Sequence, residues 1–155
     1  MFRCLASLAL LAVSSTALCD GLSIDGLILG GCIDTPSLAS RVTALRNDGP
    51  DDKIWTANIP ATYLGTSVSA SIVVNGDRRI HNIELHLPLE KLDEVKRDIT
   101  HALGEPKSDT TSFLKKGLAV WDRRDKETAV GLFSKPEAGD LLLNLIWTIP
   151  DQNHG

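Results

Sequence analysis

The sequence NIELHLPLEKLDEVKRDITHALGEP, residues 82–106, decides how this chain folds. In residues 82–87 apolar and polar side chains alternate, which is typical of a strand with one buried face. Beyond Pro88 apolar side chains recur every three or four positions, as on one face of a helix. Pro88 suits the first turn of that helix because its missing N–H would have no partner there. Gly104 can adopt the left-handed conformation that ends a helix, and Pro106 prevents its continuation.

The bulk composition narrows the class of protein. The chain has 155 residues, 43% of them hydrophobic, with 16 basic and 20 acidic side chains and a formal net charge of −4. This length and composition indicate either one globular domain or two small halves that share a core. A mildly acidic chain without a basic cluster lacks the electrostatic features of nucleic-acid binding, so no nucleic-acid partner is predicted.

Residues 1–19 are predicted to be a signal peptide. Arg3 is its positive start, residues 5–13 are its apolar segment, and small residues follow. The cut falls after Ala17 or after Cys19. No later segment is long and apolar enough to predict a transmembrane helix, so we expect an exported protein, periplasmic or secreted.

The cut site decides the cysteine chemistry. If Cys19 is retained, it can form a disulfide with Cys32 in an oxidising compartment. If it is removed, Cys32 is a single thiol, which usually packs as a small apolar side chain. A lipid anchor on Cys19 is disfavoured because Leu18 is larger than the small residue that commonly precedes such a site.

A β-hairpin is predicted before the central stretch. Apolar and serine side chains alternate from Ser67 to Val74, and Asn75-Gly76 predicts a two-residue turn. With that turn the return strand, residues 78–87, would place Ile80 on the outer face. The conflict predicts either a β-bulge near residues 81–82 or an exposed Ile80.

The order of elements predicts an α+β fold for residues 20–155. A first helix is expected to begin at Pro36 and to end before the Asn47–Pro50 stop, and three strands follow each of the two helices. The fold would then consist of two helix–three-strand (αβββ) units, with both helices on one face of an antiparallel sheet. Similar short segments in both halves, such as residues 82–88 and 144–150, suggest internal repeats at 34–88 and 89–150.

The second half carries a resemblance. A helix, Leu103-Gly104-Glu105-Pro106 and a three-stranded meander opening near Trp121 resemble small exported proteins of the BamE-like and β-lactamase-inhibitor-protein-like kind. The resemblance implies a non-enzymatic protein that scaffolds or inhibits other exported proteins. The first half matches poorly, and no binding residue is carried over.

Motifs for catalysis and for metal or cofactor binding are missing from the sequence. It lacks Cys-x-x-Cys, His-Glu-x-x-His and Gly-x-Ser-x-Gly, and no spacing singles out a pair of catalytic carboxylates. His81 and His86 are five residues apart, on opposite faces of a regular strand, so a metal site is disfavoured. We predict no catalytic residue, no cofactor and no metal ligand.

The predicted function is therefore binding of another protein, as an inhibitor, an immunity-type protein or an envelope assembly factor. The alternative is a periplasmic carrier of a small molecule or metal, and a third possibility is a small hydrolase with scattered site residues. If both helices cover one face of the sheet, the other is a platform for a partner or simply a solvated surface. Its predicted residues are Ser67, Ser69, Ser71, Glu84, His86, Asn144, Ile146 and Thr148. Trp55, Tyr63 and Trp121 would add aromatic anchors if exposed, although core packing is favoured for at least two of them.

Overall fold

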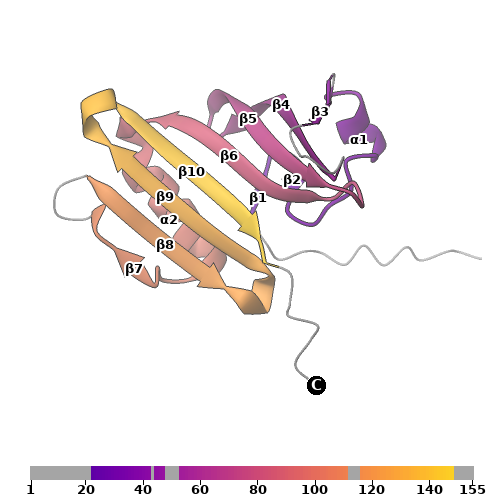
Figure 1. Ribbon diagram of the computed structural model, residues 1–155. Coiled ribbons are helices and arrows are strands. Elements are labelled where there is room, and N and C mark those ends of the chain that lie inside the picture. Colours follow the sequence, from indigo (N-terminus) through magenta and orange to yellow (C-terminus); the bar gives the residue numbers. More distant parts are fainter. Residues whose placement is uncertain (1–21, 43, 48–52, 112–115, 149–155) are drawn as a thin grey trace, which may run out of the picture.

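The computed structural model describes residues 22–42, 44–47, 53–111 and 116–148. Its main element is one antiparallel sheet of eight strands in the order β3-β4-β5-β6-β10-β9-β8-β7 (Figure 1). The strands are β3 (Arg46–Asn47), β4 (Ile54–Tyr63), β5 (Thr66–Asn75), β6 (Ile80–Pro88), β7 (Ser108–Asp109), β8 (Gly117–Arg123), β9 (Thr128–Lys135) and β10 (Asp140–Trp147). The meanders β4–β5–β6 and β8–β9–β10 meet where β6 pairs with β10.

The predicted αβββ architecture is wrong. The protein is mostly β, and α2 (Leu92–Leu103) is the one helix longer than a single turn in the described residues. The expected first helix is reduced to α1 (Pro36–Ala39), and the chain is extended again at β3, which pairs with β4. Arg41, two residues beyond Ala39, hydrogen-bonds Asp25 and the Pro60 carbonyl, and these long-range contacts compete with continuation of the helix. The suggested duplication of residues 34–88 and 89–150 stays a prediction.

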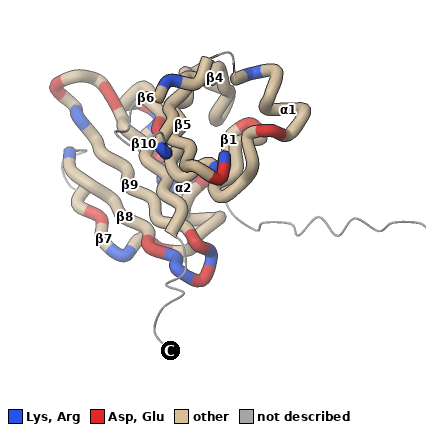
Figure 2. The backbone as a smooth tube through the Cα atoms, turned by 45° about the vertical axis from the view of Figure 1, so that its right-hand side comes forward, with Lys and Arg blue, Asp and Glu red and all other residues tan. Residues whose placement is uncertain are grey.

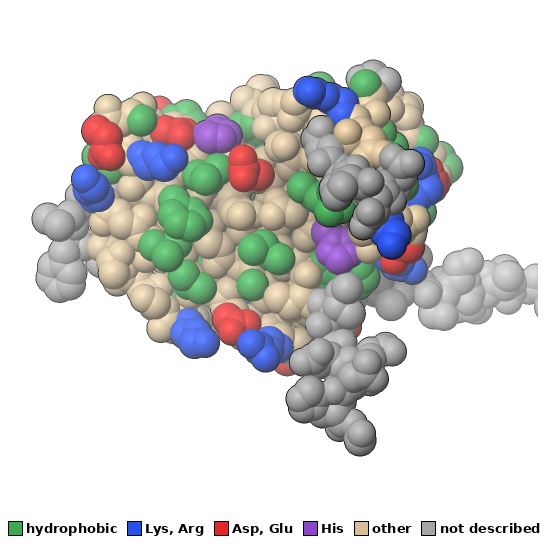
Figure 3. All heavy atoms as spheres, in the orientation of Figure 1, with side chains coloured by type: hydrophobic (Ala, Val, Ile, Leu, Met, Phe, Trp, Pro, Cys, Tyr) green, Lys and Arg blue, Asp and Glu red, His purple; other side chains and the backbone are tan. Residues whose placement is uncertain are grey.

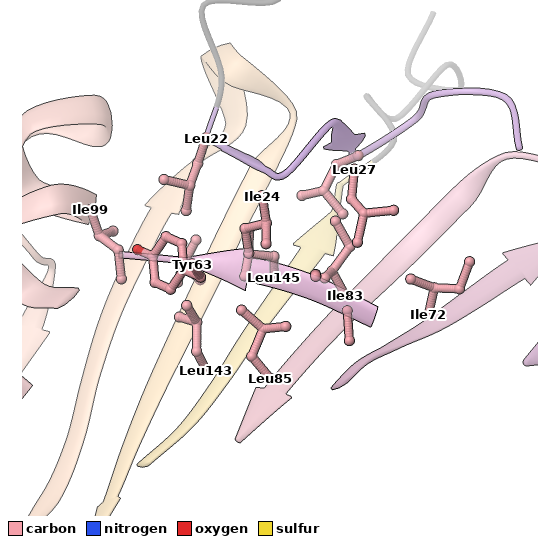
Figure 4. Close-up of a cluster of buried hydrophobic side chains, with 14 of the residues drawn as sticks. Leu22, Ile24, Leu27, Tyr63, Ile72, Ile83, Leu85, Ile99, Leu143 and Leu145 are labelled. Carbon is pink, nitrogen blue, oxygen red and sulfur yellow. The ribbon is translucent and has the colours of Figure 1, made fainter. Parts of the chain in front are cut away.

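A short hairpin replaces the missing helix as a cover for the sheet. It consists of β1 (Ser23–Ile24) and β2 (Leu27–Ile28). Figure 4 shows Leu22, Ile24 and Leu27 lying against Tyr63, Ile83 and Leu145, with Ile99 of α2 beside them. The hairpin and α2 therefore cover the same face, and this covered face carries the core.

The central stretch folds as the alternation predicts. Ile83, Leu85 and Leu87 are buried on the covered face. The helix follows a 3₁₀ turn, η1 (Leu89–Lys91), and buries one apolar stripe. The buried residues of α2 are Leu92, Val95, Ile99 and Leu103.

The β-bulge is confirmed and the two-residue turn is wrong. Val73 pairs with Asn82 while Val74 pairs with Ile80, so His81 is the extra residue on β6. The bulge lets Ile80 turn inward, and it is fully buried. The loop that precedes it has three residues, because the N–H of Asn75 bonds the carbonyl of Arg79 and Arg78 takes a positive φ of 62°. This is a common alternative to the two-residue loop.

Pro60 does not end its strand, although proline commonly interrupts a β-ladder. β4 continues through it to Tyr63. The carbonyl of Pro60 accepts a hydrogen bond from Arg41 Nη2 at 2.8 Å. In an antiparallel strand the nitrogen and the carbonyl of one residue point to the same side. Because the Pro60 carbonyl faces Arg41, the Pro60 nitrogen also faces away from β5. Its missing N–H costs no ladder bond there.

Gly104 is the residue at which α2 ends, and replacing it tests the predicted helix stop Leu103-Gly104-Glu105-Pro106. Its φ of 85° and ψ of −169° lie in a region that is essentially restricted to glycine. A Cβ would also lie 3.1 Å from Arg123 Nη1, and the Arg123 guanidinium donates to the Leu103 carbonyl. We expect Gly104→Ala to lower the free energy of unfolding by about 1–3 kcal/mol, measured by urea denaturation.

Gly139 provides the control for this experiment. Its φ of 64° and ψ of 25° are left-handed helical, which other residues tolerate, and no atom lies within 4 Å of an added Cβ. We expect Gly139→Ala to cost about 1 kcal/mol. Equal losses in the two variants would contradict the role given to Gly104.

Candidate functional site

The face of the sheet turned away from α2 and the β1–β2 hairpin is the candidate site, and we call it the open face. Seven of the eight residues predicted for a partner-binding face lie at alternate positions of β5, β6 and β10. Thr148 follows β10 directly. Three of them are neighbours across the strands, because Ser71 pairs with Glu84 and Glu84 pairs with Asn144. Ser67, Ser69, His86 and Ile146 are exposed, and the other four are half-buried.

An apolar patch on this face was missed by the sequence analysis, apart from Ile146. It occupies three neighbouring rows of β8, β9 and β10, visible as the hydrophobic area of the sheet in Figure 3. Phe133 is 38% exposed and Ile146 is 42% exposed. Gly131 leaves room for the Phe133 ring, since a Cβ there would lie 3.2 Å from Cε2. The residues of the apolar patch are Leu118, Val120, Ala129, Phe133, Leu142 and Ile146.

A sequence signal for the patch exists. Residues 141–143 are three leucines in a row, and Leu132 and Phe133 are adjacent. Because successive side chains of a strand point to opposite faces, such runs place an apolar side chain on both faces. A strand with one solvated face should instead alternate apolar and polar residues.

Charged side chains border the apolar patch. His86 lies between two carboxylates, with Nδ1 3.0 Å from Asp140 Oδ2 and Nε2 3.7 Å from Glu84 Oε1. At the opposite end of the strands, the turn η2 (Arg124–Lys126) mixes acidic and basic residues, as Figure 2 shows. There the guanidinium of Arg123 hydrogen-bonds Asp125 and lowers the pKa of that carboxyl to about 2. Charges at the edge of an apolar area are typical of the rim of a protein interface.

A groove lies where β5 and β6 separate, and we call it the opening. The ladder between these strands ends at the pair Ala70–Leu85. Beyond it β5 stays paired with β4, and β6 stays paired with β10. The opening has a volume of about 640 Å³ and is exposed to solvent. It is lined by residues 66–68 of β5, 86–88 of β6 and 138–140 before and at the start of β10.

Two polar atoms of the open-face residues have no partner in the described part of the chain. They are the side-chain oxygens Asn144 Oδ1 and Thr148 Oγ1, and both are buried. Most buried side-chain oxygens in proteins accept a hydrogen bond. Two buried side-chain oxygens on the β10 side of the open face therefore lack a hydrogen-bond donor within the described residues.

The remaining predicted residues lie elsewhere. Cys32 is half-exposed, with its Sγ 3.7 Å from Asp34 Oδ2, and Cys19 falls outside the described residues, so the disulfide stays a prediction. His81 stacks edge-on against Trp147 with ring centroids 5.1 Å apart. Within the described ranges no three His, Cys, Asp or Glu side chains form a group that could hold a metal ion. In the same ranges, no helix is both long and apolar enough to cross a membrane.

The aromatic residues considered as anchors mostly belong to the core. Trp121 and Tyr63 are buried, and Trp55 is half-buried. The Tyr63 hydroxyl donates a 2.7 Å hydrogen bond to Asp98 Oδ2. Burial, together with this contact, raises the pKa of the Tyr63 phenol well above its usual value.

This raised pKa predicts a pH dependence. In the unfolded chain the phenol ionises near pH 10, whereas in the folded protein it stays protonated. Above pH 10 the unfolded state therefore binds fewer protons than the folded state, and stability falls as the pH rises. We expect Tyr63→Phe to be less stable at neutral pH by about 1–2 kcal/mol, because Asp98 loses its donor. The variant should lose less stability than wild type when the pH is raised above 10.

Urea denaturation at neutral and alkaline pH measures both effects. Tyr63 is the only tyrosine of the chain, so ultraviolet absorbance of the tyrosinate follows its ionisation without interference. Ionisation of the folded protein near pH 10 would contradict the buried hydrogen bond.

Three comparisons of this chain with known proteins found no match. No family model, no curated protein and no solved structure matches it. Leu103–Pro106 does lie at the end of α2, and Trp121 does lie in the meander after it. The resemblance to BamE-like and β-lactamase-inhibitor-protein-like proteins stays a prediction.

Proposed function

We propose that this protein is exported and binds another protein through the open face of its sheet. The carrying observation is the apolar patch, which no described element covers. Contiguous apolar surface with a polar rim is typical of interaction sites. Phe133 would be its central anchor, because aromatic residues contribute strongly when an interface buries them.

The patch supports protein binding better than the carrier alternative. Small-molecule sites usually bury most of the ligand in a concave pocket. The opening between β5 and β6 is exposed to solvent, and the apolar patch spans three strands of the sheet. An inhibitor, an immunity-type protein or an envelope assembly factor would each use such a surface.

Pull-down experiments with three forms of the protein test this proposal. Tagged wild type, Phe133→Lys and Ile28→Lys are incubated with periplasmic and secreted fractions of the source cells. Ile28 is the matched control, because it is a similarly exposed apolar residue, 40%, in the β1–β2 hairpin instead of the sheet. We expect at least one protein that binds wild type and Ile28→Lys and does not bind Phe133→Lys. Proteins captured equally by all three forms, or by none, would contradict the proposal.

A further inference from the structure

The main chain of Ser67 faces the opening. The turn between β4 and β5 has two residues, Leu64 and Gly65, with φ of 48° and 73°. In a two-residue hairpin with both φ positive, the flanking residues, here Tyr63 and Thr66, bond each other. Main-chain direction alternates along a strand, so Ser67 points its N–H and C=O away from β4. The N–H of Thr62, opposite Ser67, donates to Asp25 Oδ2 and so also points away from the β4–β5 ladder.

Pro88 prevents the β5–β6 ladder from re-forming beyond its last pair, Ala70–Leu85. If the register of the last pair, Ala70–Leu85, continued, Ser67 would pair with Pro88. Proline has no N–H to donate to the Ser67 carbonyl, so the pair cannot form a complete ladder step. The strands have separated beyond Ala70–Leu85, and the Ser67 N–H and C=O are left toward the groove. Unpaired main-chain groups at a strand are the usual template for adding another strand.

The two sides of the opening differ in chemistry. On the open face, the carboxylates of Glu84 and Asp140 lie on either side of His86. Lys135 pairs with Asp140 across the β9–β10 ladder, on the side away from the opening. Apolar lining comes from Val68 and Leu87, whose side chains point to the opposite face.

We propose that the opening receives an extended segment of the partner protein in which a lysine or arginine is next to an aliphatic residue. This inference rests on the proposed protein-binding function and names the kind of segment bound. Consecutive side chains of an added strand point to opposite faces. The basic side chain then meets Asp140, which lines the opening, and the Glu84 carboxylate beyond His86 adds negative charge. Its aliphatic neighbour contacts Val68 and Leu87. The segment's main chain hydrogen-bonds Ser67, as in other cases of strand addition.

Selection from a display library of random ten-residue peptides tests the inference. The library is panned on the purified wild-type protein, and binding of the selected peptides is then measured on variants. Ser67→Pro removes the N–H that faces the opening, and the extended Thr66 before it tolerates proline. Ser67→Ala is the matched control, because it removes the hydroxyl and keeps the N–H. We expect peptides enriched in adjacent basic and aliphatic residues that bind wild type and Ser67→Ala equally and Ser67→Pro about tenfold more weakly.

A charge variant keeps the test decisive if Ser67→Pro does not fold. We expect Glu84→Gln with Asp140→Asn to abolish the preference for Lys or Arg over Gln in a selected peptide. Peptides that lack the basic–aliphatic pair, or that bind Ser67→Pro and the charge variant as tightly as wild type, would overturn the inference. Peptides lost only on Phe133→Lys would also overturn it, by placing the segment on the apolar patch. That result would leave the proposed protein binding intact, whereas failure of the pull-down comparison would remove its basis.

Discussion

Replacing Trp121 by alanine is expected to lower the free energy of unfolding by about 3–5 kcal/mol. Trp121 is fully buried in β8 and is among the largest side chains of the core. Its removal leaves a cavity against α2 and the sheet. Its Nε1–H also donates a 3.1 Å hydrogen bond to the carbonyl of Gly104, the residue that follows α2. The variant therefore also removes this hydrogen bond. Such a loss is a large share of the stability of an ordinary domain.

Urea denaturation followed by circular dichroism measures the Trp121 effect. Trp55→Ala is the control, since Trp55 is half-buried near the edge of the sheet. We expect its loss to be clearly smaller. Trp121→Phe separates the two contributions, because it retains most of the volume and removes the hydrogen bond. If Trp121→Ala costs no more than Trp55→Ala, the core does not centre on this side chain.

Replacing Phe133 by lysine is expected to weaken binding of the protein partner about 30-fold or more, the effect of losing a central aromatic anchor of about 2 kcal/mol. Stability should stay within about 0.5 kcal/mol of wild type, because Phe133 is on the uncovered face and lysine is tolerated on a solvated strand. A large loss of binding with little loss of stability would separate a binding role from a structural one.

Ile146→Lys extends the measurement across the patch. Ile146 lies two residues further along β10 than Asn144 and pairs with Ala129 of β9. We expect a smaller loss of binding than for Phe133, since aliphatic residues contribute less than aromatic ones at most interfaces. Binding can be measured by calorimetry once a partner has been captured. Unchanged affinity in both variants would contradict a partner seated on the apolar patch.

Much of the sheet could be predicted from the sequence because its strands follow local rules. The alternation of residues 82–87 identified β6, and the spacing after Pro88 identified the buried stripe of α2. The outward parity of Ile80 predicted either a bulge near residues 81–82 or an exposed Ile80, and the structure has the bulge, at His81. In these segments the local pattern and the tertiary environment agree.

The errors arose where local rules compete with long-range contacts. Residues 36–45 have the start signal of a helix, yet only four residues are helical, and Arg41 bonds Asp25 and the Pro60 carbonyl. Pro60 resembles a strand terminator and instead lies within a ten-residue strand, because its nitrogen faces the outer edge of the β4–β5 pair. Neither outcome could be predicted without knowing which segment lies alongside.

The candidate site shows the same division. Parity alone placed Ser67, Ser69, Ser71, Glu84, His86, Asn144 and Ile146 on one face of the sheet. The apolar patch required the pairing of β8, β9 and β10, since it forms only when Leu118, Phe133 and Leu142 become neighbours in one row.

Local sequence rules predicted the central strand, the helix that follows it, and the buried side of β5, β6 and β10. These depend on periodicity and on the covalent limits of proline and glycine, which act over a few residues. Three features depended on the tertiary structure: a hairpin replaces the first helix, β6 meets β10 in the middle of the sheet, and β5 and β6 separate beyond the pair Ala70–Leu85. Those features depend on strand order and register, which bring together residues far apart in the chain.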